Sequence, residues 1–169
     1  MAGRQYGELM GRMKTLVLGL GNPLLRDDSI GLRVAQELHD QFEGDPDVEV
    51  GEDYWGGLRL MERMIGFDRV IIIDAILTNT EPGTIHILSP DDIPTQRSAS
   101  VHDVNLPTAL EFGRQAGAVL PPASKITLIG IEAADVQTFD ETLTPELERA
   151  LPHAVEAVLS VMKRGRVRV

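Results

Sequence analysis

Uninterrupted apolar segments separated by helical patterns are the feature of this sequence that most limits its fold. The run "LVLGL" leads into a glycine turn and then into a segment in which Ile30, Val34 and Leu38 recur at four-residue spacing, as on one face of a helix. The run "RVIIIDAI" at 69–76 is the clearest strand pattern in the chain. Strands that are apolar on both sides must be covered on both sides, so these segments favour a sheet between two layers of helices.

The same alternation continues along the whole chain. We predict strands at 14–20, 47–53, 69–76, 83–89 and 125–133, and helices at 28–43, 57–65 and 104–117, followed by a long C-terminal helix. Gly66 stops the second helix, whereas Thr144 as N-cap and Pro145 at the first position begin the last one. The predicted fold is an α/β three-layer α/β/α sandwich with a mostly parallel sheet of about five strands.

The chain is short enough for one domain. A chain of 169 residues can bury roughly 70% of the surface that its unfolded form exposes, so one core suffices. Residues 1–12, "MAGRQYGELMGR", are punctuated by glycine and lack the apolar stretch of a secretory signal. We therefore expect residues 1–12 to be a disordered or non-native extension, residues 13–169 to form a single domain, and Met13 to be a candidate natural start.

Composition excludes several classes of function. The chain has no cysteine, which rules out disulfides, thiolate metal sites and a cysteine nucleophile, and fits a reducing compartment such as the cytoplasm. A net charge of −10 repels nucleic acid, and the only basic cluster, "KRGRVRV" at 163–169, also reads as cations favoured at a helix C-terminus. No apolar run approaches the roughly 20 residues that span a bilayer. We expect neither a nucleic-acid partner nor a membrane partner.

Chemistry-bearing side chains follow the predicted strands. Asp27 and Asp28 come after the first strand, Asp74 lies near the end of the third, and His102 lies in the loop beyond the fourth. Ligands of such sheets gather at the carboxyl ends of the strands, so these residues are predicted to share one rim. Carboxylates and an imidazole that converge there repel or titrate unless a cation lies between them, and this ligand set suits nickel, zinc or cobalt.

Structural roles compete with this interpretation. An aspartate before a helix often caps it, for about 1 kcal/mol, but adjacent residues point in different directions, so capping accounts for only one of Asp27 and Asp28. Asp74 at the end of a buried strand needs a partner, for which Arg33 in a structural ion pair is the alternative to a metal. From the residues alone, His102 is as compatible with a structural role as with a functional one. The remaining histidines are predicted to be packed or solvated: His39, His86 and His153.

Several segments together resemble a known family. They are "LVLGLGNPLLRDDSIGLRVAQEL", "DRVIIIDAI", "PGTIHIL", "SVHDVNL" and "ITLIGIE", and they extend the resemblance from about Met13 to the last helix. The sequence resembles the hydrogenase maturation endopeptidases, which trim the C-terminal extension from the nickel-containing large subunit of NiFe hydrogenases. The most specific segment is the motif G-N-x-x-x-x-D-D/E.

The resemblance implies a site and a substrate. Asp28, Asp74 and His102 match the family's metal-binding residues, with Asp28 and Asp74 as the catalytic pair, and Asp27 would cap the helix or orient the site. The implied substrate is a large-subunit precursor that already carries nickel, for which zinc or cadmium would substitute in vitro. The implied enzyme is a cytoplasmic, monomeric, aspartic-type endopeptidase in which the metal or a carboxylate activates water. The implied substrate-binding residues are Asn22, Asp27, Tyr54, Trp55 and Gly57.

One segment departs from the family. Many members carry D-G-G-T-x-G before the second helix, whereas this chain reads "EDYWGGLRL" and keeps Gly57. Tyr54 and Trp55 are predicted to form a wall for the tail of a particular large subunit, and the alternative is that Trp55 packs under the loop.

Three other functions remain open at this point. A non-catalytic module that binds metal during hydrogenase assembly would need the same ligands as the protease. Peptidyl-tRNA hydrolases also open with "LVLGLGNP", but this chain has no histidine before His39 and is acidic. Dinucleotide binding is the least favoured, because Leu24 replaces the third glycine of G-x-G-x-x-G.

Overall fold

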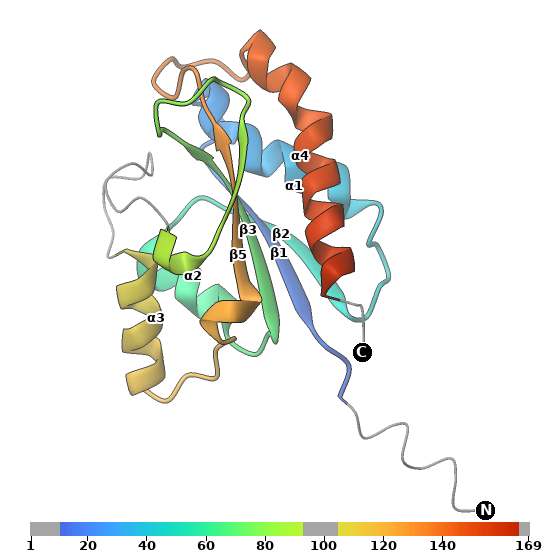
Figure 1. The fold of residues 1–169 in the computed structure, drawn as a ribbon, viewed down its shortest axis with the longest axis vertical. Coiled ribbons are helices and arrows are strands. Elements are labelled where there is room, and N and C mark those ends of the chain that lie inside the picture. The colour runs from blue at the N-terminus through green and yellow to red at the C-terminus, as the bar shows by residue number, and fades with distance from the viewer. Residues whose placement is uncertain (1–10, 93–104, 166–169) are drawn as a thin grey trace, which may run out of the picture.

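A computed structural model of the protein describes residues 11–92 and 105–165 (Figure 1). Most of the predicted N-terminal extension lies outside the described residues, as does His102, the third predicted metal ligand. The domain boundary at residue 13 therefore stays a prediction.

The described residues build the mixed five-stranded sheet that the sequence predicts. Its strands are β1 (Thr15–Leu20), β2 (Val48–Asp53), β3 (Arg69–Ile76), β4 (Ile85–Leu88) and β5 (Ile126–Glu132), in the order β2-β1-β3-β5-β4. β1 pairs in parallel with β2 and β3, and β3 pairs in parallel with β5. The sheet is therefore mostly parallel.

β4 runs antiparallel to β5, and the reason lies in the connection that precedes it. Residues 77–84 contain no helix, and so short a segment cannot carry the chain back to the opposite end of the sheet, as a parallel crossover requires. The carboxyl end of β4 therefore points away from the carboxyl ends of the other strands. This direction matters for the segment that carries His102.

Helices cover both faces of the sheet (Figure 1). α1 (Ile30–His39) and α4 (Pro145–Arg164) pack on one face, and α2 (Gly57–Met64) and α3 (Leu106–Gln115) on the other. The period of two along β3 divides its side chains between two cores, because Ile71 and Ile73 join the α1/α4 side while Val70 and Ile72 join the α2/α3 side. The three-layer prediction is confirmed. No helix in the described parts of the chain combines the length and the hydrophobicity that crossing a bilayer requires.

The start of α1 differs from the prediction in a way that shapes the site. A short 3-10 turn, Arg26–Ser29, precedes the helix, and Arg26 adopts a positive φ of 33°. Gly31 then brings α1 into direct backbone contact with the sheet, because a Cβ there would collide with the carbonyl oxygens of Leu20 and Ile73. Tight packing of this turn against the ends of β1 and β3 buries Asp27 and Asp28.

Candidate active site

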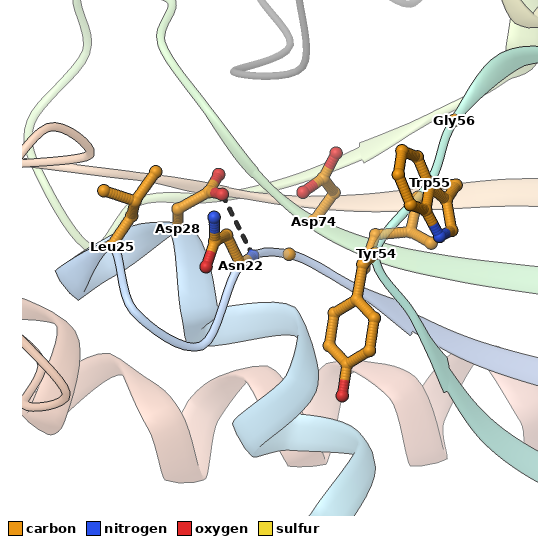
Figure 2. A pocket seen from close by; sticks show the side chains of 9 residues that line it. Asn22, Leu25, Asp28, Tyr54, Trp55, Gly56 and Asp74 are labelled. Carbon is orange, nitrogen blue, oxygen red and sulfur yellow. Dashed lines mark hydrogen bonds between the residues drawn. The ribbon is translucent and has the colours of Figure 1, made fainter.

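A cavity of about 150 Å³ opens at the carboxyl ends of β1 and β3 (Figure 2). Asp28 reaches it from the 3-10 turn and Asp74 from β3, as the parallel pairing of β1 and β3 predicts. The cavity is lined by Leu20, Gly21, Asn22, Leu25, Asp28, Tyr54, Trp55, Gly56 and Asp74. No Lys, Arg, Ser, Thr or Cys is among these lining residues, so they offer two carboxylates and no serine, threonine or cysteine nucleophile.

The two carboxylates are coupled electrostatically. Burial, followed by the charge of Asp28, raises the pKa of Asp74 from its ordinary value to about 8, against a smaller lowering by the N–H of Ala75. Burial also raises the pKa of Asp28, although the Asn22 N–H donates a hydrogen bond of 3.0 Å to its Oδ2 and opposes this shift. At neutral pH the pair without a bound cation therefore retains a proton on Asp74. A divalent cation between the carboxylates would displace that proton and relieve their repulsion.

The third predicted metal ligand stays untested. Within residues 11–92 and 105–165, no three His, Asp or Glu side chains come together in an arrangement that could hold a metal ion. His102 lies outside the described residues, and the antiparallel direction of β4 removes the argument from strand order that put its loop at this rim. The involvement of His102 therefore stays a prediction.

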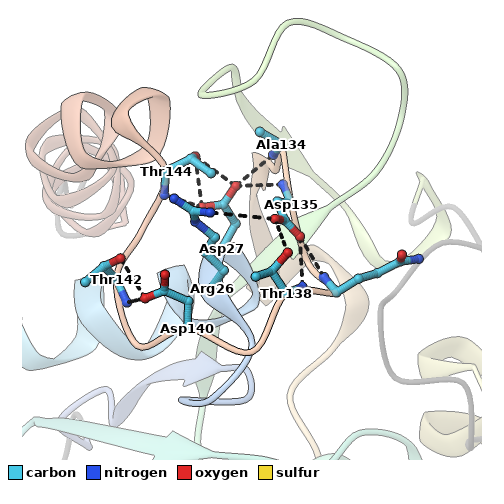
Figure 3. A network of polar contacts seen from close by, with 9 residues as sticks. Arg26, Asp27, Ala134, Asp135, Thr138, Asp140, Thr142 and Thr144 are labelled. Carbon is cyan, nitrogen blue, oxygen red and sulfur yellow. Dashed lines mark hydrogen bonds and ion pairs between the residues drawn. The ribbon is translucent and has the colours of Figure 1, made fainter.

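The Asp27 side chain points toward the connection between β5 and α4 (Figure 3), and it neither lines the cavity nor caps its own helix. Its side chain has no exposed surface, and its carboxylate accepts hydrogen bonds from Ala134, Asp135 and Thr144 in the connection between β5 and α4. The predicted capping role is therefore wrong. The predicted contact with substrate is also unsupported, because these bonds and the burial leave the carboxylate no free surface.

The predicted wall of the site is present. Tyr54 and Trp55 line the cavity and are 57% and 55% exposed, so the alternative in which Trp55 packs under the loop is wrong. The Arg59 guanidinium lies 5.1 Å from the centroid of the Trp55 ring, in the geometry of a cation–π contact. Asn22 also lines the cavity, but Gly56 does so in place of Gly57, which instead begins α2 with a positive φ of 58°.

Competing structural roles find little support in the described residues. No ion pair joins Asp74 to Arg33 among these residues, which removes the structural alternative for that carboxylate. His39 and His153 are exposed, and a His86 ring nitrogen lies 3.0 Å from the Thr80 hydroxyl, so these histidines are packed or solvated as predicted.

Sequence reasoning missed two kinds of residue at the site. Leu20, Gly21, Leu25 and Gly56 line the cavity, and their positions beside the motif residues were the only available signal. The hydrogen-bond donors to Asp27 gave no signal at all, because they lie 107 to 117 positions away in the sequence.

Comparisons with known proteins agree with the motif and the fold. The family model HycI, described as hydrogenase maturation protease, matches residues 32–161. The Hydrogenase 2 maturation protease of Escherichia coli K12 is 32% identical over 158 residues, covering 92% of this chain and 94% of that protein. The hydrogenase expression/formation protein HupD of Rhizobium leguminosarum is 29% identical, covering 92% of this chain and 77% of that protein.

The fold is also that of a solved relative. The hydrogenase maturating endopeptidase HybD from E. coli superposes with a TM-score of 0.75 at 32% identity, over 92% of this chain and 96% of that one. A HycI maturation protease from Thermococcus kodakarensis superposes with a TM-score of 0.68 at 22% identity, which shows the likeness of fold alone. These matches favour the protease resemblance over the peptidyl-tRNA hydrolase and dinucleotide-binding alternatives.

Proposed function

The chain belongs to the hydrogenase maturation protease family, and from this premise we propose that it removes the C-terminal extension of a NiFe hydrogenase large-subunit precursor after nickel insertion. The observation that carries the proposal is the cavity in which Asp28 and Asp74 meet without a basic residue among those that line it. Such a cavity suits a cationic centre presented by the substrate. The proposal takes the protein to be a cytoplasmic monomer that needs no resident metal.

Recognition of the nickel comes first in the proposed mechanism. Asp28 and Asp74, together with His102, bind the nickel that the precursor already carries, and Asp74 gives up its proton on binding. Binding at these residues aligns the scissile peptide bond over the cavity, where Asn22, Tyr54 and Trp55 contact the tail. Cleavage thereby depends on completed nickel insertion. Zinc or cadmium would occupy the same ligands in vitro.

Hydrolysis follows from the same two carboxylates. One of them accepts a proton from a water molecule while the water oxygen adds to the scissile carbonyl carbon, and the nickel supplies Lewis acidity at this step. The carboxylic acid so formed returns the proton to the leaving amine, and the C–N bond breaks. This route fits a cavity whose lining residues include no Ser, Thr or Cys nucleophile.

The test is cleavage of a precursor followed by intact mass. The protein is incubated with large-subunit precursors loaded with nickel or free of it, and loss of the C-terminal extension is measured. We expect cleavage of the nickel-loaded form only. We expect Asp74→Asn to abolish cleavage without loss of folding, whereas Asp47→Asn, an exchange at the opposite end of the sheet, leaves the rate unchanged.

Two results would overturn the proposal. An Asp74→Asn variant that cleaves the loaded precursor at the normal rate would remove Asp74 from the mechanism. Binding of every precursor without cleavage would instead identify the protein as a non-catalytic assembly module.

A further inference from the structure

Asp27 is buried in a setting that demands a carboxylate (Figure 3). Its Oδ2 accepts hydrogen bonds of 2.9 Å from the N–H groups of both Ala134 and Asp135. Its Oδ1 accepts a bond of 2.8 Å from the Thr144 N–H, and the Thr144 hydroxyl lies 2.9 Å from both oxygens. Three of these four donors are backbone N–H groups, which can only donate, so the site is built for an acceptor on both sides of the side chain.

Main-chain hydrogen bonds join the same two segments. The Arg26 N–H donates to the Asp140 oxygen at 2.8 Å, the Asp27 N–H donates to the Asp135 oxygen at 3.0 Å, and the Asp140 N–H donates to the Leu24 oxygen at 3.0 Å. The turn that carries the site motif is therefore tied to the β5–α4 connection, residues 133–144, by both main chain and side chain.

The hydrogen bonds between the 3-10 turn and the β5–α4 connection affect the cavity through Asp28, the residue after Asp27. Asp28 follows Asp27 directly, faces the cavity shared with Asp74, and has its Oδ2 held by the Asn22 N–H. Leu25, which pairs with Asp140, also lines the cavity. Fixing the main chain of Asp27 thus fixes the direction in which Asp28 leaves the turn.

We propose that Asp27 is a positioning residue for the cleavage reaction: by binding the β5–α4 connection it holds the Asp28 carboxylate toward Asp74. This inference deepens the proposed function and depends on it. The two adjacent aspartates have different roles, since Asp28 contacts the substrate whereas Asp27 contacts only the protein. The segment 133–144 is thereby a working part of the site, although none of its residues lines the cavity.

The chemistry of the donors predicts an unusual sensitivity to an isosteric change. An asparagine at position 27 must turn its NH₂ group toward either the Ala134 and Asp135 N–H groups or the Thr144 N–H. In both orientations the NH₂ group faces another hydrogen-bond donor, so Asp27→Asn disrupts the hydrogen bonds between the turn and the β5–α4 connection. Asp140→Asn is the matched control, because the Asp140 carboxylate lies in the same connection but accepts only from Thr142.

The proposed experiment measures the orientation of the Asp28 carboxylate separately from the cleavage activity. The Asn22 amide proton, which donates to Asp28 Oδ2, is followed by ¹⁵N NMR in the wild type and in the variants Asp27→Asn, Asp28→Ala and Asp140→Asn. We expect Asp27→Asn to move the Asn22 resonance toward its position in Asp28→Ala, and Asp140→Asn to leave it in place. For nickel-loaded precursor we expect Asp27→Asn to lower kcat about tenfold or more with KM changed less than about threefold, because an orienting contact acts on the reacting groups.

Further variants distinguish a positioning role of Asp27 from a general loss of folding. If Asp27→Asn does not fold, Thr144→Val removes only the hydroxyl donor and is expected to give a smaller shift of the Asn22 resonance, which Thr144→Ser restores. In an Asp28→Ala background, Asp27→Asn should cause no further loss of cleavage while its loss of stability persists.

The outcomes separate the two proposals. A folded Asp27→Asn protein with an unmoved Asn22 resonance and an unchanged kcat would overturn the positioning role. Wild-type protein that cleaves no precursor would overturn the proposed function, while the amide resonance would still decide whether Asp27 orients Asp28.

Discussion

Asp74 carries a cost in stability that follows from its burial and from the charge of the neighbouring Asp28. The folded protein holds the Asp74 proton up to a pKa of about 8, whereas the unfolded chain releases it near the ordinary value of 3.8. Between these values the folded state binds more protons, so its stability falls as the pH rises. We expect Asp74→Asn to raise the free energy of unfolding of the metal-free protein by several kcal/mol at pH 8, and to have little effect below pH 4.

Denaturant unfolding at a series of pH values checks this prediction. Asp40→Asn is the control, since the Asp40 side chain is 95% exposed. Equal stability of wild type and Asp74→Asn across the whole pH range would contradict the cost of burying Asp74 beside Asp28. A stabilised and inactive Asp74→Asn would identify a residue kept for function at the expense of the fold.

Trp55 is expected to act on substrate affinity and not on folding. Its ring is more than half exposed at the cavity, so Trp55→Ala removes little buried surface and should change the free energy of unfolding by less than about 1 kcal/mol. We expect it to raise KM for the precursor about tenfold with little change in kcat. Steady-state kinetics test this, with Phe112→Ala as the matched exposed aromatic on α3, where KM should not change.

The contrast between Asp28 and Asp27 shows how far sequence carried the site. Asp28 and Asp74 were predicted to share a rim because both follow from one rule, that parallel strands bring their carboxyl ends together. The role of Asp27 depends on donors more than 100 positions away, and no local pattern encodes such a contact. The sequence therefore indicated where Asp28 and Asp74 lie, whereas for Asp27 it left capping and orienting roles open and gave no sign of its hydrogen-bond partners.

Among the elements, α4 is anchored to the sheet by a buried arginine. Arg69, at the start of β3, is 7% exposed and donates hydrogen bonds to the carbonyl oxygens of Val161 and Met162 in the last turn of α4. A cation at a helix C-terminus satisfies carbonyls that have no partner within the helix. Arg69→Met should therefore lower the free energy of unfolding by about 2–3 kcal/mol.

Thermal and denaturant unfolding test this anchor, with the exposed Arg149→Met on α4 as control. Cleavage by Arg69→Met below its unfolding temperature should match the wild type, because Arg69 lies at the amino end of β3 and the cavity at its carboxyl end. A loss of cleavage without a loss of stability would contradict this separation.

The elements themselves were largely predictable, and β4 explains the main exception. Helices and strands differ in the spacing of their buried apolar residues, and the sequence displays this spacing directly. Strand direction instead depends on the length of the connection between strands, and the segment 77–84 is too short for a parallel crossover. The length of that segment is the signal in the sequence that indicates an antiparallel β4.

At the scale of the molecule, the carboxylate pair lies apart from the apolar core of the described residues. Two separate apolar clusters, one on each face of the sheet, contain most of the buried side chains, and neither includes Asp28 or Asp74. Burial and the charge of Asp28 raise the pKa of Asp74, so a cation bound between the two carboxylates would stabilise the folded state. In the proposed function that cation arrives with the substrate.

Chelation tests this view of the molecule. We expect protein treated with EDTA to unfold at the same temperature as untreated protein, because both hydrophobic clusters are independent of the carboxylate pair. Added zinc should raise the unfolding temperature in the wild type by binding the folded state and not in Asp74→Asn, which lacks a ligand. A fall of several degrees on chelation would mean that the isolated protein holds its own metal, and the nickel of the precursor would then have to be recognised by other residues.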